Sequence, residues 1–374
     1  MSSPSQRFLA LDVFRGMTIC FMIIVNTPGG HFSYAPLNHA VWNGFTPTDL
    51  VFPSFLFAVG NAMGFVMPRW SVLPQSGVLG KIFKRTIIIF LLGFLLYWFP
   101  FVTLDSQGHL MISPFSHTRI LGVLQRIALA YCIASLFIYY LKPRTTVIIC
   151  VLILLVYWPL MYWFGEPGDP LSLRGNAGLR FDRWLMGENH MYHGEGIAFD
   201  PEGWISTLPA VANVVAGYLV GIFVQQKGKT YEGIAKLLLA GFGLLAIGYC
   251  WDMGFPINKK LWTSSFVVYT VGLDCIILSA VIYIVDFLKK TNWTYFFQVF
   301  GKNPLFIYLL SEVGAIILYI IHVKPKISLH SWLYNSIFRH AGLYLGSFLF
   351  ALLFMLSCWL VGYLLDRQKI YIRV

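Results

Sequence analysis

Long apolar runs separated by short polar segments make up most of this chain. A helix needs about 20 mainly apolar residues to cross a bilayer core of about 30 Å. The pattern therefore predicts an all-α polytopic membrane protein with about ten transmembrane helices, ten or eleven, in a single domain over residues 1–374. The predicted spans are 8–26, 48–67, 82–100, 119–141, 145–164, 205–224, 233–250, 262–286, 304–322 and 343–365.

The polar segment between the first two spans is a candidate site for chemistry. The sequence TPGG at 27–30 ends the first helix, because proline and glycine both interrupt helices. The sequence TPTD at 46–49 leads into the second helix, and His39, Trp42 and Asn43 lie between. An imidazole can take up or release a proton near neutral pH, although a lone histidine is more often a hydrogen-bonded structural residue.

Composition supports a membrane protein and excludes a soluble one. Hydrophobic residues make up 57% of the chain and charged residues 11%, whereas soluble domains carry about 25% charged residues. The net charge of +11 does not indicate nucleic-acid binding, because the lysines and arginines flank the apolar runs. Sixteen of them fall on the side of both termini and eight on the other, which predicts cytoplasmic termini.

Neither a metal site nor a disulfide framework is expected. The six cysteines all lie within apolar runs and form no CxxC pair, and the nine histidines show no HExxH pattern. The first apolar run contains Asp12 and Arg15 and lacks a small-residue cleavage site, so we expect it to remain as a helix. The polar segment 165–204 is predicted to fold as a periplasmic loop over the outer mouth of the bundle.

Charged residues inside the apolar runs need partners, because a charge at the bilayer centre costs roughly 2.5–3.5 kcal/mol on insertion scales. Asp12 and Arg15 lie three positions apart, which favours an ion pair, with anion binding by Arg15 as the alternative. Arg119 and Arg126 lie two turns apart on one predicted helix. They either satisfy carboxylates and carbonyls or present their guanidinium groups to a phosphate or carboxylate.

Four further polar positions lie in or just before the last spans. Asp274 and Glu312 are candidate partners of the two arginines. Lys302 and Asn303 precede Pro304, which opens a helix, and this arrangement is typical of an anion-binding helix entrance.

Several motifs together give the chain a family resemblance that extends from near Arg7 to the C-terminus. It resembles the heparan-alpha-glucosaminide N-acetyltransferase family, within the transmembrane acyltransferases. The motifs, in order, are LDVFRG from Leu11, IVN ending at Asn26, HAVWNG from His39, TDLVFPSFLF from Thr48, RILGVLQR from Arg119, DRWLMGENHMY from Asp182, FDPEG from Phe199, INKKLW from Ile257 and GKNPL from Gly301.

The resemblance implies one transmembrane acyltransferase domain that moves an acetyl group from cytosolic acetyl-CoA to an amino sugar or glycan on the periplasmic side. It implies that His39 is the catalytic histidine and that Asn26 lies beside the acetyl group. Few residues precede the first helix, whereas the lysosomal enzyme carries an extra lumenal domain. We therefore expect a short bacterial relative in the inner membrane, with its acceptor undefined and with a homodimer left open.

These inferences assign roles to individual residues. His39 is the expected general base, Asn26 the oxyanion donor and Asp49 the residue that orients the imidazole. A covalent acetyl-histidine is the alternative route. The expected contacts to coenzyme A are Arg15, Lys302, Asn303, Arg367, Lys369 and Arg373, and those to the acceptor are Trp42, Asn43, Arg119, Arg126 and Glu312.

Two alternatives to N-acetylation remain open. A secondary transporter or exporter of a polar or anionic small molecule would also have broken helices and buried charges, although the sequence shows no inverted repeat. An O-acetyltransferase of a surface polysaccharide would share the donor and differ in the acceptor.

Overall fold

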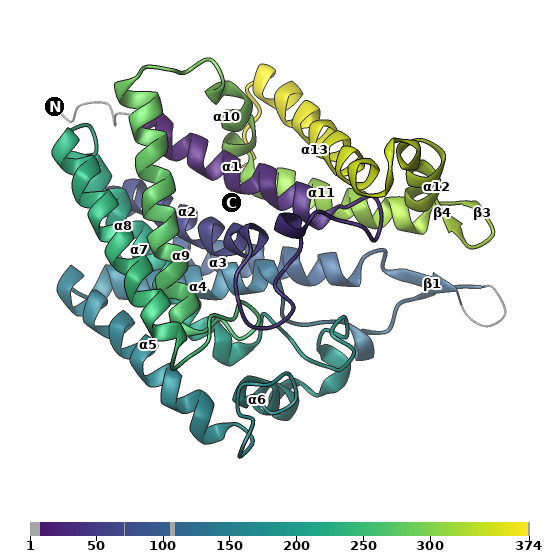
Figure 1. The fold of residues 1–374 in the computed structure, drawn as a ribbon, viewed down its shortest axis with the longest axis horizontal. Helices are drawn as coiled ribbons and strands as arrows, with labels where there is room; N and C mark the ends of the chain where they lie inside the picture. The colour runs from purple at the N-terminus through teal and green to yellow at the C-terminus, as the bar shows by residue number, and fades with distance from the viewer. Residues whose placement is uncertain (1–7, 71, 105–108, 373–374) are drawn as a thin grey trace.

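The computed structural model describes residues 8–70, 72–104 and 109–372 and shows a chain that is almost entirely helical (Figure 1). Two short antiparallel hairpins, β1–β2 and β3–β4, extend from it. The elements are α1 (Leu9–Asn26), α2 (Pro47–Trp70), α3 (Gln75–Trp98), β1 (Val102–Leu104), β2 (Leu110–Ile112), α4 (Val123–Tyr140), α5 (Pro143–Phe164), α6 (Ala177–Met186), α7 (Trp204–Lys227), α8 (Tyr231–Asp252), α9 (Ser264–Ile282), α10 (Thr294–Lys302), α11 (Pro304–Ile320), β3 (His322–Lys324), β4 (Ile327–Ser328), α12 (Leu329–Ser336) and α13 (Leu343–Arg367).

The prediction of a polytopic all-helical membrane protein is confirmed. Within the described residues, eight helices are long and apolar enough to cross a membrane, and the bent pair α10 and α11 makes a ninth. The remaining predicted span coincides with α3, which has 24 residues but includes Lys81, Lys84 and Arg85. With these three charged residues, α3 is not among the helices apolar enough to cross a membrane. The structure therefore supports eight or nine spans, where the sequence predicted ten or eleven.

Glycines allow the central helices to approach one another closely. A Cβ atom at Gly217 of α7 would lie 2.0 Å from the carbonyl oxygen of Phe57 on α2, and one at Gly16 of α1 would lie 1.8 Å from that of Phe297 on α10. Small residues at such crossings let membrane helices pack backbone to backbone. Helices α8 and α9 lie side by side at the left of Figure 1, whereas α11, α12 and α13 lie at the right.

The start of α2 is fixed by its first polar residues. Pro47 occupies the first helical position, where its missing amide hydrogen costs nothing. Asp49, two residues later, accepts from the backbone N–H of Thr46 at 3.0 Å, which is half of a capping box. Thr48 instead donates to the carbonyl of Pro36 at 2.9 Å. These bonds tie the segment 27–46, called the connector below, to the end of α2.

A sharp break separates α10 from α11. Their axes differ by 84°, and Asn303 lies at the corner, completely buried, just before Pro304. The Asn303 side chain holds the chain's last described residues: its amide donates to the carbonyl of Ile370 at 3.0 Å, and its oxygen accepts from the N–H of Ile372 at 2.8 Å. The segment 368–372 is thereby clamped against the break.

The polar segment that follows α5 packs as an ordered layer at the connector end of the bundle. Its residues Leu179, Met191 and Phe199 form a small apolar core with Met161 of α5 and Phe255 after α8. The indole of Trp42 in the connector packs against Phe199 and donates to the carbonyl of Leu171 at 2.9 Å. The connector and this segment therefore form one structural unit.

Candidate active site

His39 lies over the start of α2 with its imidazole paired to a buried carboxylate. Its Nδ1 atom is 2.7 Å from Oδ1 of Asp49, whose side chain is 1% exposed, whereas the His39 side chain is 44% exposed. The other oxygen of Asp49 accepts from the N–H groups of Ala40 and Thr46 and from the Thr46 hydroxyl. This geometry is the one expected if Asp49 orients His39. Because Nδ1 contacts the carboxylate, Nε2 is turned away from it.

Lys259 completes this group, and sequence reasoning did not single it out. Its Nζ atom lies 3.1 Å from Nδ1 and 3.2 Å from Nε2 of His39, and 3.9 Å from Oδ1 of Asp49. Because the first two distances are nearly equal, the ammonium lies between the ring nitrogens rather than along the lone pair of either. We call His39, Asp49 and Lys259 the histidine cluster.

The loop between α8 and α9 places Lys259 in the cluster. Asn258, completely buried, donates to Oδ1 of Asn43 at 3.1 Å and accepts from the N–H of Leu261 at 2.8 Å. Trp262 is also buried, and its φ of 53° lies in the left-handed region that bulky residues rarely adopt. Burial lowers the pKa of Lys259 to about 8, although the charges of Asp49 and Glu202 act in the opposite direction.

Two predicted ligand-binding arginines are held by the segment that leads into α7. Arg119 bonds both oxygens of Asp200, at 3.0 and 2.6 Å, and Glu202 at 2.6 Å. Arg126 donates to the carbonyl of Pro201 at 2.8 Å and to the hydroxyl of Ser206. The sequence left two roles open for these arginines. The contacts support the first, in which the arginines donate hydrogen bonds to carboxylates and backbone carbonyls. The shared predicted helix was wrong, because α4 begins at Val123 and Arg119 precedes it.

Glu202 links these arginines electrostatically to the histidine cluster. Burial favours its protonated form, but the charges of Arg119, Arg126 and Lys259 outweigh that effect and hold the pKa of Glu202 below its usual value. The arginines and the histidine cluster therefore belong to one polar region at the connector end.

The two acids that were expected to pair with the arginines have other partners. Glu312 accepts from the Asn26 amide at 3.2 Å, and Asp274 accepts from the Ser54 hydroxyl at 2.5 Å. The expectation that these two acids pair with Arg119 or Arg126 was therefore wrong. The structure brings Asn26 next to Glu312 at the end of α1, whereas Asn43 and Trp42 hold the connector to neighbouring loops.

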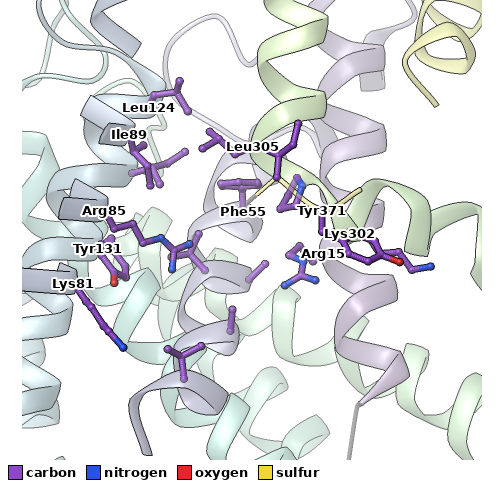
Figure 2. Close-up of a pocket in the computed structure, with 18 of the residues that line it drawn as sticks. Arg15, Phe55, Lys81, Arg85, Ile89, Leu124, Tyr131, Lys302, Leu305 and Tyr371 are labelled. Atoms are coloured by element: carbon purple, nitrogen blue, oxygen red, sulfur yellow. The ribbon is translucent and has the colours of Figure 1, made fainter. Parts of the chain in front are cut away.

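A cavity of about 850 Å³ opens at the opposite end of the same helices (Figure 2). The described residues that line it include five cations and no carboxylate. Phosphate groups bind best to lysine and arginine, so the wall has the charge required by a polyanionic ligand. The cations are Arg15, Lys81, Lys84, Arg85 and Lys302, and we call this space the basic cavity.

Helix α3 contributes three of these cations, which the sequence indicated only as charges that flank an apolar run. Lys81, Lys84 and Arg85 have a spacing that places them on one helical face. In Figure 2 the guanidinium group of Arg85 extends into the cavity from the wall opposite Arg15. None of the three forms a salt bridge with a carboxylate of the described residues; Lys81 lies over Trp70 and Arg85 over Tyr131 instead. The Tyr131 hydroxyl, buried in the same wall, has no hydrogen-bond partner among the residues that the structure describes.

The predicted coenzyme A ligands divide into two groups. Arg15 and Lys302 line the cavity, each beside a carboxylate: Arg15 is 2.8 Å from Asp12, as the spacing predicted, and Lys302 is 2.7 Å from Asp366. Asn303 clamps the segment 368–372 rather than facing the cavity. Arg367, which stacks on Tyr363, and Lys369 do not line the cavity, and Arg373 lies outside the described residues.

The two sites lie along the same helix. Asp49 is near the start of α2, and the cavity wall runs from Phe55 to Trp70 at the other end. At 1.5 Å per residue, the near edge of the cavity is about 9 Å along the axis from Asp49 and the far edge about 32 Å. A long, flexible ligand anchored in the basic cavity would thus point one end toward the histidine cluster.

The chain is similar to known proteins over most of its length. A model of the family described as heparan-alpha-glucosaminide N-acetyltransferase, catalytic, matches residues 7–231. The heparan-alpha-glucosaminide N-acetyltransferase of Mus musculus is 28% identical over 369 residues, 83% of this chain, and that of Homo sapiens is 27% identical over 371 residues, 84% of this chain. The chain spans about half the length of these curated relatives, 54% of each. It belongs to the heparan-alpha-glucosaminide N-acetyltransferase catalytic family.

Proposed function

We propose that this protein is a transmembrane acetyltransferase that transfers the acetyl group of acetyl-CoA to the amino group of a sugar or glycan. One observation carries the proposal: a cavity with five cations and no carboxylate in its described wall opens at one end of α2, and a histidine–aspartate pair lies at the other. Coenzyme A has a polyanionic end and a long arm that ends in the thioester. The two features therefore match the two ends of the donor.

The histidine cluster supplies the proton chemistry of this proposal. Asp49 accepts from the Nδ1–H of His39, which leaves the lone pair of Nε2 available for a proton. As the acceptor amine attacks the thioester carbon, Nε2 takes the amine proton and later returns a proton to the departing thiolate. The covalent route, in which Nε2 itself carries the acetyl group, needs the same tautomer.

The membrane orientation is part of the proposal. The basic cavity faces the cytosol, where acetyl-CoA is found, and both termini lie on that side. The connector and the segment 165–204 lie on the opposite, periplasmic side, where the acceptor approaches the exposed face of His39. A bacterial inner membrane and a homodimer stay predictions.

The experiment is a thiol-release assay on purified protein in nanodiscs with acetyl-CoA and glucosamine. Wild type should release coenzyme A in step with acetylated product. His39→Ala should lower kcat at least about 100-fold, the lower end for a lost acid–base group, and leave the acetyl-CoA Kd within about twofold. A His39→Ala protein that turns over near the wild-type rate would contradict the assignment.

The same assay separates the alternatives. The 84° break between α10 and α11 is also a feature of secondary transporters, but a transporter would not cleave the thioester. Sugars that offer only hydroxyl groups, tested beside glucosamine, distinguish O-acetylation from N-acetylation.

A further inference from the structure

The third member of the histidine cluster has a position that the proton chemistry above does not use. Lys259 is 3.2 Å from Nε2 of His39, the atom beside which the reacting carbonyl must lie for proton transfer or attack. A donor at this distance from Nε2 can also reach an oxygen bonded to the carbon that reacts there. Because Lys259 does not lie on the Nε2 lone pair, it leaves that atom free for the substrate.

We propose that Lys259 is a catalytic residue whose ammonium binds the acetyl carbonyl oxygen as it becomes an oxyanion. The inference rests on the proposed acetyl transfer and names a further group for it. In the step, the amine nitrogen forms a bond to the carbonyl carbon and the π electrons move onto oxygen. The π bond then re-forms, the C–S bond breaks and the thiolate leaves. Lys259 gives and takes no proton, whereas His39 carries the amine proton to sulfur.

The surroundings of Lys259 support this role over a purely structural one. Its loop is held by the buried Asn258 and by the left-handed backbone of Trp262, and such strained conformations cluster at functional sites. Its nearest carboxylate, Asp49, is 3.9 Å away and already accepts four hydrogen bonds. By contrast, the neighbouring Lys260 forms a close ion pair with Glu195 at 2.6 Å.

The Asn26 amide is placed less favourably for the same task. It donates to Glu312 at 3.2 Å and carries no charge. Charged donors form hydrogen bonds about twice as strong as neutral ones, so a developing oxyanion gains more from an ammonium than from an amide.

The first test compares Lys259→Met with Lys260→Met, its matched neighbour. Losing one oxyanion donor costs about 100- to 1,000-fold in kcat, so Lys259→Met should show that loss while the acetyl-CoA Kd stays within about twofold. Lys260→Met should keep kcat within about threefold. Equal losses of kcat in the two variants would overturn the role of Lys259. So would a Lys259→Met kcat near wild type when His39→Ala is inactive. Either result would leave the proposed function standing.

The second test uses pH, because a structural lysine would not impose a pH limit on kcat. The charged groups that act on Lys259 are Asp49, His39, Glu202, Lys260 and Arg126. With a pKa of about 8, the ammonium is present below that pH and lost above it. Wild-type kcat should therefore fall as pH rises through about 8. The kcat of Lys259→Arg, which stays charged, should not fall as pH rises through about 8. If kcat of this variant falls as it does in wild type, the proposal is contradicted.

The third test shows whether a loss of kcat comes from the missing ammonium or from misfolding. Aminoethylation of the Lys259→Cys variant restores an ammonium at the same place and should recover at least about tenfold in kcat. Wild type treated with the same reagent is the control for the native cysteines. A folded, aminoethylated protein that binds acetyl-CoA and shows no recovery would count against the role.

Discussion

Asp49 is the residue on which the geometry of the histidine cluster depends. One carboxylate oxygen faces His39, and the other accepts from Ala40, the Thr46 N–H and the Thr46 hydroxyl. Both oxygens must be acceptors for this arrangement to hold. The position thus couples the tautomer of the imidazole to the path of the connector.

Replacing Asp49 with asparagine should impair catalysis more than folding. The amide oxygen would take the side with three donors, so the amide N–H₂ would face His39 and favour the tautomer with hydrogen on Nε2. That tautomer has no lone pair at the reacting atom, and kcat should fall at least about 100-fold. Steady-state kinetics with glucosamine, beside an acetyl-CoA Kd near wild type, measure the effect. A kcat within threefold of wild type would show that Asp49 does not set the tautomer.

Sequence reasoning was more successful with neighbours along the chain than with distant partners. The His39–Asp49 and Asp12–Arg15 pairs are ten and three positions apart, and helix geometry or a short connector indicates both. Lys259 is 220 positions from His39, and nothing in its local pattern distinguishes it from Lys260. Glu312 and Asp274 were assigned wrong partners for the same reason, since Asn26 and Ser54 reach them from other helices.

At the scale of an element, α3 shows how one pattern can have two meanings. Lys81, Lys84 and Arg85 at the start of an apolar run were interpreted as topology signals, and flanking charges usually are. In the folded protein the same three side chains line the basic cavity. Spacing along the helix indicated a common face, but only the packing of α3 beside α4 shows what that face meets.

We expect α3 to supply much of the binding energy for acetyl-CoA. Lys84→Gln and Arg85→Gln should each raise the acetyl-CoA Kd about tenfold, since a hydrogen bond to a charged group contributes roughly 1.5–3 kcal/mol. Binding should also become less sensitive to salt. Arg144→Gln is the matched control, because Arg144 is exposed in the first turn of α5 and does not line the cavity.

Titration calorimetry at two salt concentrations gives both quantities. If Lys84→Gln, Arg85→Gln and Arg144→Gln all bind acetyl-CoA with the wild-type Kd, the basic cavity is not the acetyl-CoA site.

The positions and order of the long apolar helices could be predicted from hydropathy alone, whereas their exact number and their breaks could not. A helix lies at each of the ten predicted spans, because apolar length is a property of the local sequence. The 84° corner at Asn303 depends on that side chain bonding two backbone groups of the segment 368–372. A proline indicates that a helix starts but not the direction it takes.

On the scale of the whole molecule, the two candidate sites lie at opposite ends of α2. Under the proposed function this separation suits transfer across a membrane, because the donor and the acceptor then reach the protein from different compartments. The proposed function therefore includes one orientation of the bundle in the membrane.

Cysteine labelling from one side of sealed vesicles tests the orientation. Arg174→Cys, in the segment after α5, and Lys290→Cys, between α9 and α10, place exposed thiols at the two ends. A membrane-impermeant maleimide added outside spheroplasts should label the first variant and not the second until the membrane is opened. The parent protein without either substitution controls for native cysteines. Labelling of both from one side would contradict the proposed topology.

The charge of the basic cavity has a consequence for the control of flux. Under the proposed function its five cations hold the nucleotide end of the donor, the part that the reaction leaves unchanged. Spent coenzyme A keeps these contacts and loses only the acetyl group, so it should bind about as tightly as the substrate and act as a competitive product inhibitor. Turnover would then follow the ratio of acetylated to free carrier in the cytosol rather than the amount of acetyl-CoA, and the modification of a distant glycan would report the metabolic state of the cell.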